Sequence, residues 1–405
     1  MEQEDIAVIA AARTPFGKFG GTLRDLTHPQ LGAHVVRHVL DRAGADPSSV
    51  DEVAFGVNLP GADRSIARQI LVDSGIPPEK VAYTVDRACC SSLAAITLAS
   101  RSLRVGDADV AIAGGAENMS RTPYFLTQQR WGHSLGDITL KDQLVIACPM
   151  TGRPRAVQAG EEAVEYGITR EQQDVWAARS HHRYIEARDA GKFAEEIVAI
   201  DVDAGRQGMV SFAEDEAVRP DTTVEKLAKL KPIYGNPTVT AGNAPGLSTG
   251  ATAMLLTKVR TAEAHGMTPL ATLHGWSMAS GHPDRIASIP AEAIRMALKK
   301  TGLTLDDMDV IEINEAFAAV PLVSSHILAG HDEAAAEKLR ERINVNGGAI
   351  AIGHPTGATA ARLVMTAMYE LRRRYAADPS RPYYGVVGIC GGIGEAEGVV
   401  VRVGA

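Results

Sequence analysis

Cysteine is scarce in this sequence, which contains four in 405 residues: Cys89, Cys90, Cys148 and Cys390. So few cysteines in a chain of this size exclude a fold held together by disulfides. Cys89 and Cys90 are adjacent, and none of the four has the spacing of zinc ligands, so we expect no metal site. This cysteine usage predicts a reduced, cytoplasmic protein.

The sequence also has no excess of positive charge and no long apolar run. The formal net charge is −8, which argues against nucleic acid as a partner, because phosphate binding needs a basic field. No stretch approaches the ~18 to 20 apolar residues of a membrane span. The acidic residues 1–5 resemble neither a signal nor a transit peptide. Hydrophobic residues make up 45% and charged residues 22%, the balance of a soluble globular protein without a membrane partner.

Short β-branched runs alternate with helical stretches along the chain, which is typical of an α/β fold. A helix is predicted over 28–43, where apolar residues recur with a 3.6-residue period, Thr27 can cap the start and Gly44 suits the exit. A second is predicted over 170–190, after a capping-box threonine at Thr169. The runs expected to form buried strands are 6–10, 53–57, 110–113, 310–313 and 384–389.

A weak internal repeat indicates two similar halves. Residues 110–115 resemble residues 387–392, and residues 50–56 resemble residues 308–314. Buried strands share Val, Ile and Gly in any case, which is the alternative explanation. The common order of elements favours duplication, and two facing α/β halves would place a site at their seam.

The middle of the chain breaks this pattern and predicts a long insertion, which in a compact domain is usually functional or disordered. We therefore divide the chain into three parts: an N-terminal core half (1–120), a loop domain with the return to that half (121–250), and a C-terminal core half (251–405).

Four positions could carry chemistry. Cys89 precedes an Ala-rich helical run, and the positive end of a helix favours thiolate. His354 stands in a glycine-rich turn that leaves room for a reacting group. Cys390 follows a strand-like run and precedes glycines, which offers an acid/base thiol beside backbone N–H donors. Asn314 follows the strand expected at 310–313. Each also has a plain structural explanation: buried core cysteines, a satisfied loop histidine, a strand-end turn, or a helix cap.

In combination these motifs resemble one family, the thiolases, over essentially the whole chain. Other matching segments are Arg13 to Gly21, Ala113 to Ser120, Thr238 to Ala244 and Asn314 to Phe317. The resemblance implies a duplicated five-layer α-β-α-β-α core with an inserted loop domain. It also implies Cys89 as the acyl-accepting nucleophile and His354 as its base. Cys390 would be the second acid/base, Asn314 would bind the thioester oxygen through a water, and the N–H of Gly392 would join that of Cys89 in an oxyanion hole.

The resemblance also implies that acyl-CoA and CoA are the substrates, with no further cofactor. The residues expected to contact CoA are Arg219, Lys226, Ala244, Gly246 and Phe317. A locally basic rim suits a ligand with several phosphate charges, although lysines on a solvated helix face would look the same. Members of the family are homodimers or homotetramers.

Two segments depart from the family pattern. Residues 150–157, Met-Thr-Gly-Arg-Pro-Arg-Ala-Val, replace the loop that lies beside the acyl group, and Pro245 replaces a serine that touches the pantetheine. Both concern substrate recognition rather than the reacting groups.

The sequence therefore predicts an acyltransferase of fatty-acid metabolism that forms or cleaves a 3-ketoacyl-CoA by ping-pong chemistry at Cys89. Acetoacetyl-CoA is one expected substrate, and longer or branched 3-ketoacyl-CoA is the alternative. A ketosynthase would need a second catalytic histidine at the position where this chain has Cys390. A non-catalytic acyl-CoA-binding protein would not need Cys89, His354 and Cys390 together.

Overall fold

The computed structural model describes residues 5–127, 129–145 and 147–404. A single hydrogen-bonded sheet runs through the molecule in the order β12-β13-β14-β11-β1-β10-β5-β3-β4, with β2 (Gly17–Lys18) paired to β10. Its strands are β1 (Ile6–Arg13), β3 (Glu52–Gly56), β4 (Val81–Val85), β5 (Val110–Asn118), β10 (Ser248–Lys258), β11 (Ala271–Ser280), β12 (Val310–Ile313), β13 (Tyr383–Cys390) and β14 (Glu395–Val403).

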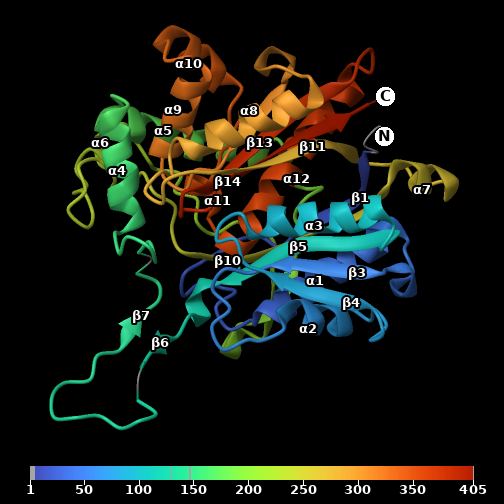
Figure 1. Cartoon of the computed structure of the whole chain (residues 1–405), viewed down its shortest axis with the longest axis horizontal. Coiled ribbons are helices and arrows are strands. Elements are labelled where there is room, and N and C mark those ends of the chain that lie inside the picture. Colours follow the sequence, from blue (N-terminus) through green and yellow to red (C-terminus); the bar gives the residue numbers. More distant parts are fainter. Residues whose placement is uncertain (1–4, 128, 146, 405) are drawn as a thin grey trace.

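The sheet consists of two halves that face each other across a central helical layer (Figure 1). Helices α3 (Ser91–Val105) and α12 (Thr356–Ala377) lie in that layer. Helices α1 (His28–Ala43) and α2 (Ile66–Asp73) cover the outer face of one half, and α8 (Ile289–Thr301) covers the outer face of the other. This is the predicted five-layer α-β-α-β-α core.

The two halves repeat one topology. In the first half β3 runs parallel to β5, and the neighbours β5–β10 and β10–β1 are antiparallel. In the second half β12 runs parallel to β13, and β13–β14 and β14–β11 are antiparallel. The duplication predicted from the sequence is therefore confirmed.

The residue register predicted for the repeat is wrong. The predicted repeat aligns Glu52 with Val310, and in the sheet Glu52 pairs with Ala111 whereas Val310 pairs with Gly385. Ala111 thus corresponds to Gly385 in that alignment, three residues from the predicted Gly388. Strands buried on both faces are made of the same few residue types, so a shifted alignment looks as good as the true one.

The halves join where β1 lies between β10 and β11. Only the beginning of β1 reaches β11, through the pairs Ile6↔Leu273, Ala7↔Thr272 and Val8↔Ala271. The inner faces of both halves, α3 and α12 share one buried apolar cluster, against which Cys89 packs. The reacting groups proposed from the sequence therefore lie near the seam.

Between β5 and β10 the chain forms the predicted insertion. A long arm with β6 (Tyr124–Phe125) and β7 (Lys141–Asp142) projects from the body (Figure 1). The remaining helices and strands of the insertion are α4 (Arg155–Glu165), α5 (Arg170–Asp189), β8 (Ile200–Asp203), β9 (Met209–Phe212) and α6 (Val224–Leu227). Glu315 ties α5 to the core, because it accepts hydrogen bonds from Trp176 Nε1 (2.9 Å) and Ser180 Oγ (2.7 Å).

The other helices are α7 (Val259–Ala264), α9 (Ala319–Leu328), α10 (Glu333–Glu341) and α11 (Ala349–Ile352). In the described part of the chain no helix is both long and apolar enough to span a membrane.

Candidate active site

Cys89 lies in the tight turn that joins β4 to α3. Ala88 before it has φ 49, a left-handed conformation that is rare for a residue with a side chain and is often found at functional sites. Cys90 after it is fully buried, and its Sγ donates to the carbonyl of Ile389 (3.5 Å). Cys89 itself is partly exposed. The turn therefore presents Cys89 and not its neighbour.

The same turn is fastened to the opposite half of the molecule. Arg87 forms ion pairs with Glu395 (2.7 Å) and Glu397, both on β14. Ile389, which accepts from Cys90, lies on β13. The turn with Cys89 belongs to the first half and Cys390 to the second, so the candidate site lies where the halves meet.

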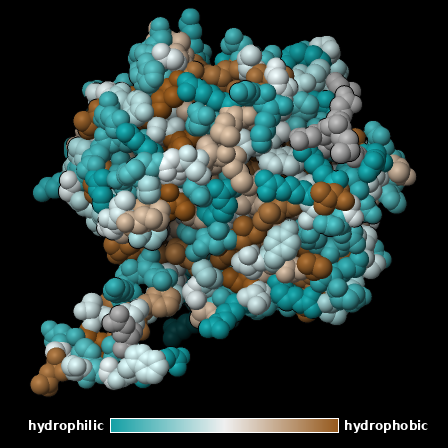
Figure 2. Space-filling view, in the orientation of Figure 1, coloured by the Kyte–Doolittle hydropathy of each residue, from teal (hydrophilic) through white to brown (hydrophobic). Residues whose placement is uncertain are grey.

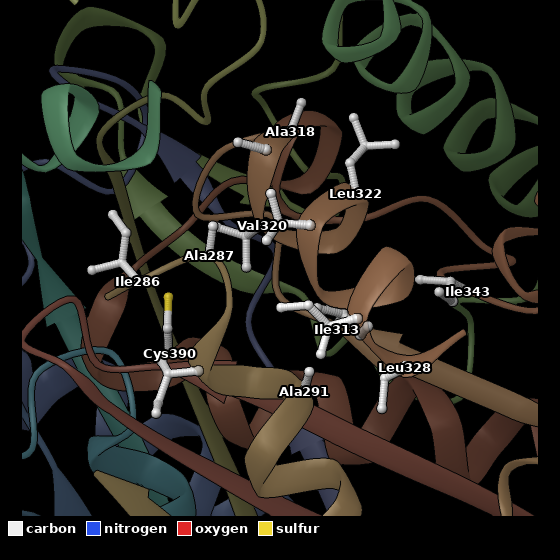
Figure 3. Close-up of a cluster of buried hydrophobic side chains, with 14 of the residues drawn as sticks. Ile286, Ala287, Ala291, Ile313, Ala318, Val320, Leu322, Leu328, Ile343 and Cys390 are labelled. Carbon is white, nitrogen blue, oxygen red and sulfur yellow. The ribbon is translucent and has the colours of Figure 1, made fainter. Parts of the chain in front are cut away.

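Cys390 is the last residue of β13 and lies at the edge of a buried apolar cluster, with Ile286 and Ala287 beside its side chain (Figure 3). Burial raises the pKa of its thiol to about 12, although a hydrogen bond from the backbone N–H of Gly392 opposes this shift. Gly392 has φ 68, which glycine adopts readily. Cys390 is therefore held as a protonated thiol next to an available backbone donor.

The helix terminus, which favours thiolate at Cys89, is opposed by the surroundings of the thiol. Burial raises the pKa of the Cys89 thiol, and the neighbouring Cys390 raises it further, whereas Arg155 opposes both effects. The helix begins at Ser91, so desolvation outweighs the helix field at Cys89. Attack by Cys89 therefore requires a base.

His354 has the tautomer that a base needs. The hydroxyl of Thr359 donates to the carbonyl of Pro355 (2.9 Å), so it accepts from Nδ1–H of His354 (2.8 Å). Nε2 then carries a lone pair, to which Asn314 Nδ2 donates (3.3 Å). Gly353 is required beside it, because its φ is 111 and a Cβ would lie 2.8 Å from Ser248 Oγ.

The electrostatic setting of His354 keeps the imidazole neutral. Burial, and secondarily the positive charge of Arg362, lower its pKa to about 3. The imidazole is therefore unprotonated throughout the neutral pH range, with a lone pair on Nε2, and the same burial makes it a weaker base than a solvent-exposed histidine. Asn314 completes this side of the site: its Oδ1 is buried without a hydrogen-bond partner among the described residues, which suits a bound water.

The two central helices place Cys89 and His354 in equivalent positions. Each residue stands two positions before the first residue of its helix, α3 or α12. The helix starts adjoin, since the N–H of Ala361 donates to Ser92 Oγ (3.0 Å). Glu117 fixes the start of α12 by accepting from the N–H of Gly357 (3.0 Å). Sequence reasoning missed Thr359 and Glu117 as positioning residues.

Of the residues expected to bind CoA, three lie near His354. Asn243, next to Ala244, accepts from the N–H of Ala318, next to Phe317 (2.9 Å). Ser248 Oγ donates to the carbonyl of Gly246 (2.7 Å) and accepts from the N–H of His354 (3.0 Å).

The two basic CoA candidates lie on the surface of the insertion. Arg219 contacts His181 on α5, and Lys226 is paired with Asp221 (2.7 Å). The structure shows no contact between these two side chains and the reacting groups. Among the described residues, no cluster of His, Cys, Asp and Glu is arranged to hold a metal ion.

Comparisons with known proteins place the chain in a family. Residues 6–260 match the family "Thiolase, N-terminal domain", and residues 267–403 match "Thiolase, C-terminal domain". A probable acetyl-CoA acetyltransferase of Mycolicibacterium smegmatis is 39% identical over 98% of this chain and 100% of its own length. The beta-ketothiolase BktB of Cupriavidus necator is 40% identical over 98% of both chains.

The solved structure of human mitochondrial 3-ketoacyl-CoA thiolase in complex with CoA superimposes with a TM-score of 0.91. It is 36% identical, and the match covers 100% of this chain and 99% of that one. The matches to the two family domains, to the relatives and to the solved structure together cover nearly the whole sequence. The chain belongs to the thiolase family.

Proposed function

We propose that this protein catalyses the reversible cleavage and formation of 3-ketoacyl-CoA through an acyl group on Cys89. The supporting observation is that Cys89 and His354 precede the adjoining starts of α3 and α12, while Cys390 from the other half acts electrostatically on Cys89. The Nε2 atom of the neutral His354 carries a lone pair, which accepts from Asn314 Nδ2 and would take the thiol proton in place of that bond. Thiolate is both a good nucleophile and a good leaving group, as reversible acyl transfer demands.

In the cleavage direction His354 takes the proton of Cys89, and the sulfur attacks the C3 ketone of the substrate. The C2–C3 bond breaks, and its electron pair remains on C2 of the departing acetyl-CoA. Cys390 gives its proton to C2 and becomes a thiolate. The thiol of a second CoA then gives its proton to the Cys390 thiolate and attacks the acyl-Cys89 thioester. The bond between the acyl carbon and Cys89 breaks, Cys89 takes back its proton from His354, and the shortened acyl-CoA is released. All atoms and protons are accounted for without a further cofactor.

Negative oxygens in this cycle need fixed donors. We assign the N–H groups of Cys89 and Gly392 to one oxygen, and a water held by Asn314 to the other. Donors of this kind contribute ~3 to 4 kcal/mol each to transition-state stabilisation. The unpartnered Oδ1 of Asn314 supports the water, since a buried carbonyl without a partner is costly.

We assign CoA binding to the turn with Ala244 and Gly246, to Phe317, and to the outer basic residues Arg219 and Lys226. The turn supports this because it links Phe317 to His354. The human relative whose structure contains CoA has the same fold. We also propose a reducing, cytoplasmic setting, because free thiols at Cys89 and Cys390 must persist for turnover.

Replacing Cys390 by alanine tests the division of labour between the thiols. We expect steady-state turnover to fall by roughly 10² to 10⁴-fold, the usual contribution of a general acid–base group. Formation of acetyl-Cys89 from acetyl-CoA, followed by mass spectrometry, should fall less than ~10-fold, because that step moves no proton at C2. Cys148→Ala is the matched control and should leave both rates unchanged. Equal losses in the two rates would contradict the assignment.

The relatives bear names of both acetyltransferases and ketothiolases, so chain length is a separate question. Turnover of acetoacetyl-CoA compared with that of a long 3-ketoacyl-CoA separates the biosynthetic from the degradative alternative. A non-catalytic binding role is less favoured, because a binder needs no neutral histidine beside two thiols.

We further propose that the chain forms a homodimer or homotetramer. Strand β4 ends the sheet at one edge, and its Val81 is 59% exposed, as at a strand that pairs with another copy. The projecting arm carries Trp131 and Leu135, which are 92% and 105% exposed, and Figure 2 shows hydrophobic residues at its end. Large exposed apolar side chains mark association surfaces.

The double substitution Trp131→Ser/Leu135→Ser should therefore reduce the mass of the assembly in light scattering. Activity per chain should stay within about twofold, because surface substitutions far from a site rarely disturb it. An unchanged mass would show that the arm is not an assembly contact. A double substitution of exposed residues on the body, Val72→Ser/Val105→Ser, is the control.

A further inference from the structure

Arg155 lies at the reacting centre, although neither the proposed cycle nor the expected site residues include it. It is the first residue of α4, inside the segment 150–157 that departs from the family pattern. Its Nε lies 3.1 Å from the place that a Cβ on Gly392 would occupy, so the guanidinium rests against the proposed oxyanion donor. Its positive charge also acts on both thiols, lowering the pKa of Cys89 and of Cys390 against the larger effect of burial.

The charge of Arg155 has no carboxylate partner within the described residues, in contrast to the arginines around it. Arg153 pairs with Glu161 and with Asp284 (3.2 Å). Arg285 pairs with Glu165 (2.6 Å). The Nη1 atom of Arg155 is buried and has no hydrogen-bond partner in the described part of the chain. Arg155 is partly buried, and a buried donor without a partner is costly, so this arrangement calls for an anion from outside.

The side-chain contact that Arg155 does make is with a thiol. Burial alone would raise the pKa of Cys148, but hydrogen bonds from Thr151, from the backbone of Met150 and from Arg155 together lower it to about 7. A thiol that is half ionised at neutral pH compensates the guanidinium only in part. One face of Arg155 is therefore occupied, and Nη1 stays available.

The segment that carries Arg155 is fixed before any substrate arrives. Arg153 and Gln158, on either side of it, both bind Asp284. One turn further along α4, Glu162 accepts from the backbone N–H groups of Ile286, Ala287 and Ser288, at 2.9, 2.7 and 3.0 Å. A guanidinium held in this way meets its partner with little loss of side-chain freedom.

We propose that Arg155 is a specificity-determining residue that binds a carboxylate carried by the acyl group on Cys89. The preferred substrates are then short 3-ketoacyl-CoA thioesters whose acyl chain ends in a carboxylate. This inference rests on the proposed function. The acyl group that moves to Cys89 after cleavage of the C2–C3 bond carries its distal carboxylate unchanged, so Arg155 takes no part in bond making.

The guanidinium suits this role because a fork of N–H donors pairs with a carboxylate in two parallel hydrogen bonds. A site built around such a pair discriminates strongly against an uncharged analogue, because the analogue leaves the buried donors without a partner. Only a short spacer fits between the thioester and the carboxylate, since Arg155 lies within reach of Gly392 and acts on Cys89 itself.

The experiment compares two CoA thioesters that differ only at the end of the chain: 3-ketoadipyl-CoA, which ends in a carboxylate, and 3-ketohexanoyl-CoA, which ends in a methyl group. We expect the unmodified protein to prefer the carboxylate by ~100-fold in kcat/KM. Arg155→Met should remove this preference, so that the ratio of kcat/KM for 3-ketoadipyl-CoA to kcat/KM for 3-ketohexanoyl-CoA falls to about 1; a loss that acts through the thiols is common to both thioesters and cancels in this ratio. Arg155→Lys should keep part of the preference for the thioester that ends in a carboxylate. Arg285→Met, which removes a paired arginine nearby, is the matched control and should keep all of it.

Two outcomes overturn the proposal. In the first, the unmodified protein cleaves acetoacetyl-CoA but shows no preference for the thioester that ends in a carboxylate. Arg155 then does not bind the end of the acyl chain, and the proposed function stands. If Arg155→Met lowers kcat/KM for both thioesters equally and moves alkylation of Cys89 by iodoacetamide to higher pH, Arg155 serves the thiols instead. Failure of the proposed function looks different: no 3-ketoacyl-CoA is cleaved, and no acyl group appears on Cys89. Cleavage of 3-ketohexanoyl-CoA by Arg155→Met shows that the variant is folded.

Discussion

Cys89→Ser should lower turnover by roughly 10⁴ to 10⁶-fold, the range measured when an enzyme loses its nucleophile. A serine hydroxyl has a pKa far above that of a thiol, so it yields almost no alkoxide, and an alkoxide leaves an ester less readily than a thiolate leaves a thioester. The fold should remain intact, because the turn is held by Arg87 and by Cys90 rather than by Cys89. Steady-state kinetics with acetoacetyl-CoA and CoA measure the loss.

Cys90→Ser provides the matched control for that experiment. Its side chain is buried against Ile389 on the opposite half, so activity should survive within about tenfold even if stability falls. In the unmodified protein, acyl label from a 3-ketoacyl-CoA should appear on Cys89 after unfolding and digestion. Label on Cys90 or Cys148 would show that the nucleophile is misassigned.

His354→Asn should have an effect of similar size, because asparagine keeps a hydrogen-bonding group but cannot take a proton. Burial raises the pKa of Cys89, so unassisted thiolate is rare near neutrality. We expect alkylation of Cys89 by iodoacetamide at neutral pH to slow by about 10²-fold or more in the variant. The rate should recover only well above pH ~8.5, the ordinary thiol pKa, because burial raises the pKa of Cys89.

A structural histidine would give a different result. Asparagine would then lower stability and leave the pH profile of alkylation in place, and that outcome on protein shown to be folded by circular dichroism would remove the base assignment. His265→Asn, a substitution of an exposed histidine after α7, is the control for a general effect of losing an imidazole.

Local signals in the sequence were sufficient for several elements. The helix predicted over 28–43 is α1 (His28–Ala43), with Thr27 and Gln30 forming both bonds of a capping box and Gly44 in the left-handed conformation. Thr169 caps α5 in the same way. Such caps involve residues a few positions apart, so the pattern of side chains reveals them directly.

Contacts between distant parts of the chain could not be predicted in this way. Glu117 fixes the start of α12 through Gly357, which is 240 residues away. The motifs predicted Cys89, His354 and Cys390 as reacting groups, but they did not indicate the raised pKa of Cys89, which depends on burial and on Cys390 from the other half. The altered loop at 150–157 pointed to substrate choice, yet only the structure shows that Arg153 is paired and Arg155 is not.

The position of β1 in the middle of the sheet has a consequence for how the protein is made. Ile6 finds its ladder partners at Lys258 and Leu273, so about 250 residues must leave the ribosome before β1 can enter the sheet. At ~5 to 20 residues per second this takes roughly 12 to 50 s. During that time an apolar strand, Ile6–Arg13, which is buried along its whole length in the finished fold, has no place in the sheet. The nascent chain is therefore a natural client for chaperones that bind extended apolar segments, and strands β10 and β11 end that dependence when they emerge.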